Sequence, residues 1–239
     1  MEGEPVAYLL GEREFYGLKF KVTTATLIPR PETELLVELS LQLILPQSTC
    51  RVLDLGTGSG AIALSIAHAR PRANLVAVDA SSAALEVAEF NTRRLGLHNV
   101  KLLQSDWFSA LHGECFDIIA SNPPYIAADD AHLVQGDVRF EPLTALASGA
   151  DGLDDIRRIA AQAKTHLHAN GRLLLEHGYG QAGQVRALLK QAGYTGVFSV
   201  PDLAGIERVS GGSWLPGKNS AVPRPPQKAL SRKVKAQRA

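Results

Sequence analysis

Short apolar runs and amphipathic stretches alternate along this chain from residue 51 onward. Between the apolar runs, apolar residues recur at helical spacing in residues 61–70, 81–95, 151–168 and 181–192, which predicts four helices. The apolar runs predict strands at residues 51–55, 74–78, 100–104, 116–120, 172–176, 195–200 and 207–214. Alternation at this spacing predicts an α/β fold with a Rossmann-like, mostly parallel seven-stranded sheet and helices on both faces.

Upstream of this region the pattern changes. Residues 14–22 predict a β-hairpin turned at Tyr16-Gly17, and a helix follows over residues 31–45. With 239 residues, 45% of them hydrophobic, the chain is long enough for one sizeable core. We therefore divide it into an N-terminal hairpin and linker segment (1–30), one main domain (31–214) and a tail (215–239).

The net charge of +1 conceals an asymmetry between the tail and the rest of the chain. The tail holds seven basic residues, four prolines and no acidic residue, so we predict that it is disordered. Removing these seven leaves 18 basic and 24 acidic residues, a net charge of about −6 for the remainder. A solvated extension is favoured for the tail over a contact with nucleic acid or the ribosome.

Composition also limits the cellular setting. No apolar stretch approaches the roughly 20 residues needed to span a bilayer, and the first residues lack the features of a secretory signal. The two cysteines, Cys50 and Cys115, have no metal-ligand spacing. We expect a cytoplasmic monomer that contacts no membrane and holds no metal.

In doubly wound sheets, ligands bind beyond the carboxyl ends of the strands. The strand at 51–55 ends in the loop Gly56-Thr57-Gly58-Ser59-Gly60, which runs directly into a helix. Glycines at every second position leave room for a ligand to approach the backbone. The spacing G-x-G-x-G differs from the G-x-G-x-x-G of dinucleotide sites and so disfavours NAD.

Two further strand ends carry polar or aromatic side chains. Asp79 ends the second strand, where a carboxylate would accept hydrogen bonds from both hydroxyls of a ribose and repel a 2′-phosphate. After the third strand, Asp106 is placed to accept from an exocyclic amine and Trp107 to wall in an adenine. Taken singly, Trp107 fits an ordinary half-buried tryptophan equally well.

The strand at 116–120 ends in Asn122-Pro123-Pro124-Tyr125. This turn presents one side-chain amide and two carbonyls as acceptors, and neither proline offers a competing backbone donor. Two successive prolines hold these acceptors in place before any ligand arrives. With the glycine loop, Asp79 and Trp107, the turn describes an S-adenosylmethionine site beside a receptor for a planar NH2 group.

The motifs DLGTGSG, Asp79, Asp106-Trp107 and NPPY resemble class I S-adenosylmethionine-dependent methyltransferases that alkylate planar amide or amino nitrogens. That superfamily includes enzymes acting on adenine N6 in DNA, guanine N2 in RNA and glutamine N5 in proteins. NPPY alone does not choose among them.

Other segments narrow the resemblance to the release-factor glutamine N5-methyltransferases (HemK/PrmC type), over about residues 3–214. The most selective is Arg30-Pro31-Glu32-Thr33-Glu34, since the sister family acting on a ribosomal-protein glutamine has serine after the arginine. The remaining similar segments are residues 4–15, 26–29, 139–142, 175–178 and 202–209. The resemblance implies methyl transfer to the glutamine amide of the Gly-Gly-Gln motif of a peptide-chain release factor, with S-adenosylhomocysteine as the product.

The resemblance also implies roles for the motif residues. Asn122 Oδ1 and the Pro123 carbonyl would accept the two N–H bonds of the substrate glutamine, with Pro124 beside them and Tyr125 packed over the amide plane. The cofactor would be held by Gly56, Thr57, Gly58, Ser59, Gly60, Asp79, Trp107 and Asn122. Transfer would be a direct displacement without a covalent enzyme intermediate or a strong general base.

Two acidic residues and one histidine have more than one interpretation. Glu32 and Glu34 either start the helix at Pro31, where acids suit the first turn, or line the substrate pocket. His177 is the nearest candidate for a base, although a structural histidine after a strand is favoured.

Three alternatives stay open at this point. A nucleic-acid amino-group methyltransferase (adenine N6 or guanine N2) would need a basic groove or a target-recognition domain, against which the acidic core argues. A ribosomal-protein glutamine is the second alternative, and a non-catalytic module that only binds the cofactor is the third. Family members usually carry a helical N-terminal domain that helps hold the release factor. This chain starts just past the position where that domain would end. A fragment, a truncated gene model and a natural short form would each explain this start.

Overall fold

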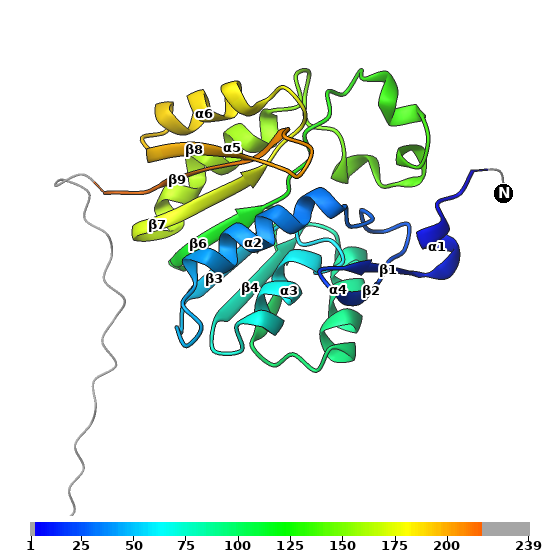
Figure 1. Cartoon of the computed structure of the whole chain (residues 1–239), viewed down its shortest axis with the longest axis horizontal. Helices are drawn as coiled ribbons and strands as arrows, with labels where there is room; N and C mark the ends of the chain where they lie inside the picture. The colour runs from blue at the N-terminus through cyan, green and yellow to red at the C-terminus, as the bar shows by residue number, and fades with distance from the viewer. Residues whose placement is uncertain (1–2, 217–239) are drawn as a thin grey trace, which may run out of the picture.

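Seven strands form one sheet in the order β5-β4-β3-β6-β7-β9-β8 in the computed structural model, which describes residues 3–216 (Figure 1). The strands are β3 (Arg51–Leu55), β4 (Asn74–Asp79), β5 (Val100–Gln104), β6 (Phe116–Ser121), β7 (Leu167–Glu176), β8 (Thr195–Pro201) and β9 (Glu207–Ser213). The pairs within β5-β4-β3-β6-β7 are all parallel, and β9 runs antiparallel to both β7 and β8. The predicted mostly parallel seven-stranded sheet is confirmed.

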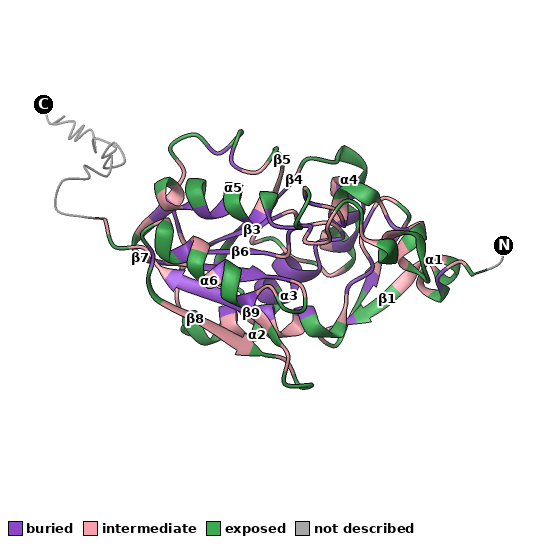
Figure 2. Cartoon of the chain, turned by 90° about the horizontal axis from the view of Figure 1, so that it is seen from above, coloured by how far each residue is buried: buried purple, intermediate pink, exposed green. Residues whose placement is uncertain are grey.

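Helices cover both faces of this sheet. The helices are α2 (Glu34–Leu43), α3 (Ala61–Ala69), α4 (Ser82–Arg94), α5 (Asp154–Ala163) and α6 (Ala182–Gln191). Alternate residues of β3 serve the two faces: Val52 belongs to the core beneath α2 and α3, and Leu53 to the core beneath α5 and α6. Figure 2 shows the central strands β6 and β7 largely buried, whereas β8 at the edge of the sheet is mostly of intermediate burial. Parallel strands covered on both sides read as the continuous apolar runs seen in the sequence.

Two predicted helices are shorter in the structure. The segment predicted as a helix from 31 to 45 begins with a 3-10 turn at Pro31–Thr33 and continues as α2. The segment predicted as a helix from 151 to 168 is α-helical only over α5. The helix cannot begin before Gly152, because this residue has a left-handed φ of 75°. A 3-10 turn (Lys164–His166) follows, and β7 starts at Leu167, five residues before the predicted strand.

The predicted hairpin is present as β1 (Glu12–Phe15) and β2 (Leu18–Lys21). Its turn residues, Tyr16 and Gly17, both have positive φ, as a two-residue hairpin turn of the primed type requires. Phe15 and Phe20 are buried in the core beneath α2 and α3. A short helix that the pattern did not predict, α1 (Val6–Leu10), precedes the hairpin. The boundary at residue 30 stays a prediction.

A long connection between β6 and α5 was also not predicted to hold any structure. It contains three 3-10 turns, Ala131–Val134, Val138–Phe140 and Leu143–Ala145. A bridge between Ile126 and Ala147 closes its base. In Figure 1 this green segment projects from the same side of the sheet as α1.

Three negative observations apply to residues 3–216 alone. No helix there is long and apolar enough to cross a membrane. No group of three or more histidine, cysteine, aspartate or glutamate side chains is placed to hold a metal ion. Nearly all of the predicted tail, from residue 217, lies outside the described residues.

Asn91 of α4 joins the hairpin to the main sheet. Its side chain is fully buried, with Oδ1 accepting from the backbone N–H of Lys21 at 2.7 Å. The Nδ2 group donates to the carbonyls of Lys21 and Ser59, at 3.0 and 2.9 Å. One amide therefore satisfies backbone groups of both the hairpin and the glycine loop.

Replacing Asn91 with alanine should lower the free energy of unfolding by about 2 kcal/mol, because buried backbone groups lose their partners. Urea denaturation of the full chain measures this change. Thr92→Val, at the next position of α4, is the matched control, since the Thr92 hydroxyl donates to the Ala88 carbonyl of the same helix and links no other element among the described residues. Equal losses in the two variants would contradict the linking role of Asn91.

Candidate functional site

The strand order reverses between β3 and β6. The chain runs outward from β3 to β4 and β5, then returns to add β6 on the other side of β3. The carboxyl ends of β3 and β6 therefore meet where no connection covers them, which is where open α/β sheets bind ligands. A cavity of about 630 Å³ opens at this place.

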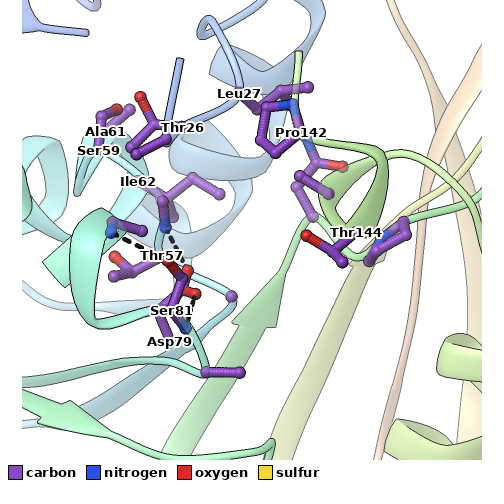
Figure 3. Close-up of a pocket in the computed structure, with 18 of the residues that line it drawn as sticks. Thr26, Leu27, Thr57, Ser59, Ala61, Ile62, Asp79, Ser81, Pro142 and Thr144 are labelled. Atoms are coloured by element: carbon purple, nitrogen blue, oxygen red, sulfur yellow. Dashed lines mark hydrogen bonds between the residues drawn. The ribbon is translucent and has the colours of Figure 1, made fainter. Parts of the chain in front are cut away.

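Eight of the eleven predicted site residues line this cavity, and three do not. The lining residues are Gly56, Thr57, Gly58, Ser59, Asp79, Trp107, Asn122 and Pro124. Gly60, Pro123 and Tyr125 are not among the lining residues. Figure 3 shows the part of the wall that runs from Thr57 and Asp79 to Pro142 and Thr144.

The glycine loop has a conformation that side chains would obstruct. Gly56 has a φ of 71°, and a Cβ added there would lie 3.5 Å from the Trp107 ring. Gly60 has a φ of 86°, and its Cβ would come within 2.9 Å of Leu64. Glycine is therefore required by the backbone as well as by any ligand.

Asp54 holds the glycine loop from within the core. Its Oδ2 accepts from the Thr57 hydroxyl at 2.6 Å and from the Ala63 backbone at 3.2 Å. Its Oδ1 has no hydrogen-bond partner in the described structure. Burial raises the pKa of Asp54 to about 7, although the bonds from Thr57 and Ala63 favour the carboxylate.

Asp79 connects the second strand to the glycine loop. Its Oδ2 accepts from the Gly58 N–H and its Oδ1 from the Ser81 N–H, both at 2.9 Å (Figure 3). Ser81 in turn caps α4 by accepting from the Ala84 N–H. Each carboxylate oxygen keeps a second lone pair for a hydroxyl on the cavity side.

The indole of Trp107 is fixed in the wall. Trp107 has a φ of 51°, unusual for a bulky residue, and its Nε1 donates to Asp155 Oδ1 at 3.2 Å. Asp106 lines the same cavity, and its two carboxylate oxygens accept from Arg158 at 2.9 and 2.8 Å, which leaves each oxygen a second lone pair, so its predicted contact with an exocyclic amine stays a prediction.

Asn122 is held by a buried row of polar side chains. Its Nδ2 donates to the Thr33 hydroxyl at 3.2 Å, and that hydroxyl donates to Glu176 Oε1, also at 3.2 Å. Burial raises the pKa of Glu176 to about 7, opposed by the bond from Thr33 and the charge of Arg208.

Tyr125 packs on the far side of this turn. A Cβ added to Gly178 would lie 3.2 Å from its ring, and its carbonyl accepts from Gln181 Nε2 at 2.9 Å. Burial raises the pKa of its phenol, and the nearby Glu176 acts in the same direction. Tyr125 is therefore held against the segment of Gly178 and Gln181, and its predicted packing over the substrate amide stays a prediction.

The structure corrects one interpretation of the RPETE segment. Thr33 lines the cavity, whereas Glu32 and Glu34 do not. Glu32 is exposed in the 3-10 turn, and Glu34 accepts from the Tyr16 N–H at 2.8 Å, which joins α2 to the hairpin. Thr33, which lies between the two glutamates and to which the sequence assigned no role, is the residue of this segment that lines the cavity.

A strap formed by residues 26–30 crosses the cavity wall. Its Arg30 forms a salt bridge with Glu141, a residue of the β6–α5 connection that is 6% exposed. Glu141 also accepts from the Ile28 N–H at 3.0 Å, and the Tyr8 hydroxyl donates to the Thr26 carbonyl at 2.7 Å. Figure 3 shows Leu27 of the strap close to Pro142 of the connection.

His177 has a structural environment. It is fully buried, and its Nε2 lies 2.8 Å from Ser210 Oγ. Burial lowers its pKa. This agrees with the favoured structural interpretation of the residue.

The sequence analysis missed several residues of the site. Asp54, Thr33 and Glu141 all occur in segments that it quoted, yet only their spatial neighbours reveal what they contact. Asp155 and Arg158 carried no signal beyond the first turns of an amphipathic helix.

Comparisons with known proteins agree with this geometry. Residues 46–196 match a family model described as a methyltransferase domain. A release factor glutamine methyltransferase of Bordetella pertussis is 54% identical over 213 residues, 89% of this chain and 78% of the relative. The chain belongs to the release factor glutamine methyltransferase family. Another member, from Escherichia coli, is 51% identical over 89% of this chain and 76% of its own length.

A solved structure also matches this chain and carries the name of the same family. It is the release factor-specific protein-(glutamine-N5) methyltransferase of Alicyclobacillus acidocaldarius, 34% identical with a TM-score of 0.50. The match covers 79% of this chain and 95% of that one. The class I methyltransferase fold predicted from the sequence is thus confirmed for this family member.

The buried carboxyl of Asp54 gives the stability of this family member a pH dependence. Because its pKa is about 7 in the folded protein and its ordinary value is 3.8, the folded state holds a proton that the unfolded state releases between these two pH values. This contribution is fully present below about pH 4 and is lost as the pH rises through 7. Asp54→Asn should remove this contribution. The free energy of unfolding of the wild type minus that of the variant, measured from pH 4 to pH 8, should therefore fall as the pH rises. Parallel profiles would contradict the raised pKa.

Proposed function

We propose that this chain transfers the methyl group of S-adenosylmethionine to the side-chain amide nitrogen (N5) of the glutamine in the Gly-Gly-Gln motif of a peptide-chain release factor. The observation that carries the proposal is the position of Asn122, which shares one cavity with the glycine loop and Asp79. Membership of the release factor glutamine methyltransferase family supports the choice of acceptor.

The cavity fits the proposed cofactor. Its volume lies within the range of about 300–1,000 Å³ typical of small-molecule sites. The glycine loop, Asp79 and Trp107 would hold the nucleoside and amino-acid parts, with Trp107 facing the side where Gly56 has no side chain. S-adenosylmethionine supplies a methyl group bonded to a positively charged sulfur, which is the electrophile that an amide nitrogen needs.

Asn122 and Pro123 would receive the substrate amide. An amide nitrogen is a poor nucleophile because its lone pair is delocalised into the carbonyl, so orientation matters more than a strong base. Asn122 Oδ1 and the Pro123 carbonyl are the acceptors that would hold both N–H bonds of the glutamine and stabilise positive charge developing on its nitrogen. Pro124 would line the same receptor, and Tyr125, packed against Gly178, would keep the turn rigid.

A methyltransferase acting on nucleic acid is less well supported. The chain outside the tail carries a net charge of about −6, which opposes a polyanion. The relatives at 50–55% identity are named for release factor glutamine methylation. We therefore infer a protein partner, with a monomeric enzyme in the cytoplasm.

A labelled-methyl assay tests this function directly. The full chain and S-adenosylmethionine are incubated separately with release factor, with release factor whose Gly-Gly-Gln glutamine is replaced by alanine, and with DNA. Label should enter only the unaltered release factor. Label on DNA alone, or on the alanine-substituted factor to the same extent, would overturn the proposal.

Asn122→Ala should abolish methyl transfer while leaving cofactor binding largely intact, because it removes the side-chain acceptor for the glutamine amide. Methyl transfer is followed by the labelled-methyl assay and cofactor binding by calorimetry. Normal turnover by this variant would exclude the proposed role of Asn122.

Asp79→Ala is the matched contrast for that experiment. It removes the carboxylate that joins the glycine loop to β4, so calorimetry should record weaker binding of S-adenosylmethionine. A defect in transfer without a defect in cofactor binding is then specific to Asn122.

A further inference from the structure

Three polar side chains from distant parts of the chain form one row that begins in the cavity wall, where Asn122 and Thr33 lie, and ends at the buried Glu176. Asn122 follows the end of β6, Thr33 ends the 3-10 turn before α2, and Glu176 ends β7. The row reads Asn122 Nδ2 to Thr33 Oγ1 to Glu176 Oε1, with both distances 3.2 Å. Thr33 is 4% exposed and Glu176 is 2% exposed.

The direction of the hydrogen bonds in this row is fixed by its buried end. When Glu176 is ionised its oxygens only accept, so the single hydroxyl proton of Thr33 points at Glu176. The Thr33 oxygen then offers Asn122 only a lone pair, and a lone pair binds the NH2 end of an amide. The Oδ1 end of Asn122 is consequently turned away from Thr33.

We propose that Thr33 and Glu176 are positioning residues that select the orientation of the Asn122 amide, so that its Oδ1 faces the substrate amide. The inference rests on the proposed function, since only an NH2-bearing substrate needs an acceptor at this place. In the opposite orientation Asn122 would present its own NH2 group to the NH2 group of the glutamine, two donors with no proton acceptor between them.

Other properties of the row support this selection. The other oxygen, Glu176 Oε2, has no hydrogen-bond partner in the described structure. Among the described residues, the Glu176 side chain therefore accepts one hydrogen bond, from Thr33. A glutamate kept almost fully buried at such a cost is expected to have a specific task.

Replacement of Thr33 by valine keeps the shape of the side chain and removes the hydroxyl. The Asn122 amide then loses its directing partner, so kcat should fall about tenfold or more while KM for S-adenosylmethionine stays within about twofold. Thr33→Ser keeps the hydroxyl and should retain most of the activity. Thr195→Val, on the exposed end of β8, is the matched control for the same chemical change.

Glu176→Gln is the second variant, and it changes polarity without changing size. Its Nε2 would donate to the Thr33 hydroxyl, which would then donate to Asn122 Oδ1 and reverse the amide. The fall in kcat should match that of Thr33→Val, and the double variant should be no worse than the poorer single variant, because all act through Asn122.

A measurement on the enzyme without substrate completes the test. The side-chain NH2 resonances of Asn122, assigned by their loss in Asn122→Asp, should shift in Thr33→Val and in Glu176→Gln but not in Thr33→Ser. Unchanged kcat and unchanged resonances in both variants would overturn the inference, as would equal damage from Thr33→Ser. Wild-type enzyme that fails to methylate release factor would instead overturn the proposed function, so the two failures are distinguishable.

Discussion

Coverage of both faces of the sheet is the constraint on which this structure depends. Five parallel strands lie between α2 and α3 on one side and α5 and α6 on the other, so their side chains are apolar on both faces. The polar side chains of the site, such as Asp79 and Asn122, stand at or just beyond the strand ends. The reversal of strand order between β3 and β6 then selects one pair of ends, and the cavity forms there.

Buried carboxyl groups hold the segments that emerge at these ends. Asp54 fixes the glycine loop through Thr57 and Ala63, and Glu141 fixes the strap through Arg30 and Ile28. Each of these groups organises backbone or side-chain donors that would otherwise lack partners, which rigidifies the cavity wall before any ligand binds. A preorganised wall suits a reaction in which the nucleophile is weak and orientation is decisive.

The fold was largely predictable because its signals are local. The strands from β3 to β6 lie within one residue of their predicted bounds, since each is an apolar run ended by glycine or polar residues. The predicted bounds were wrong where a turn interrupts an amphipathic helical pattern, and the turns of the long connection were not predicted. Gly152 shortened the predicted helix before α5, and the 3-10 turns between β6 and α5 have no periodic pattern.

The sequence by itself determined the order of strands and helices, the glycine loop, Asp79 and the NPPY turn, because periodicity and turn chemistry act over a few residues. Only the tertiary structure decided which side chains work together at the site. Thr33 meets Asn122 across 89 positions and Glu176 across 143, and Arg30 meets Glu141 across 111. Such partners come together only when the sheet and the connections between its strands have folded. Local sequence preferences act over a few residues and cannot specify a contact at that separation.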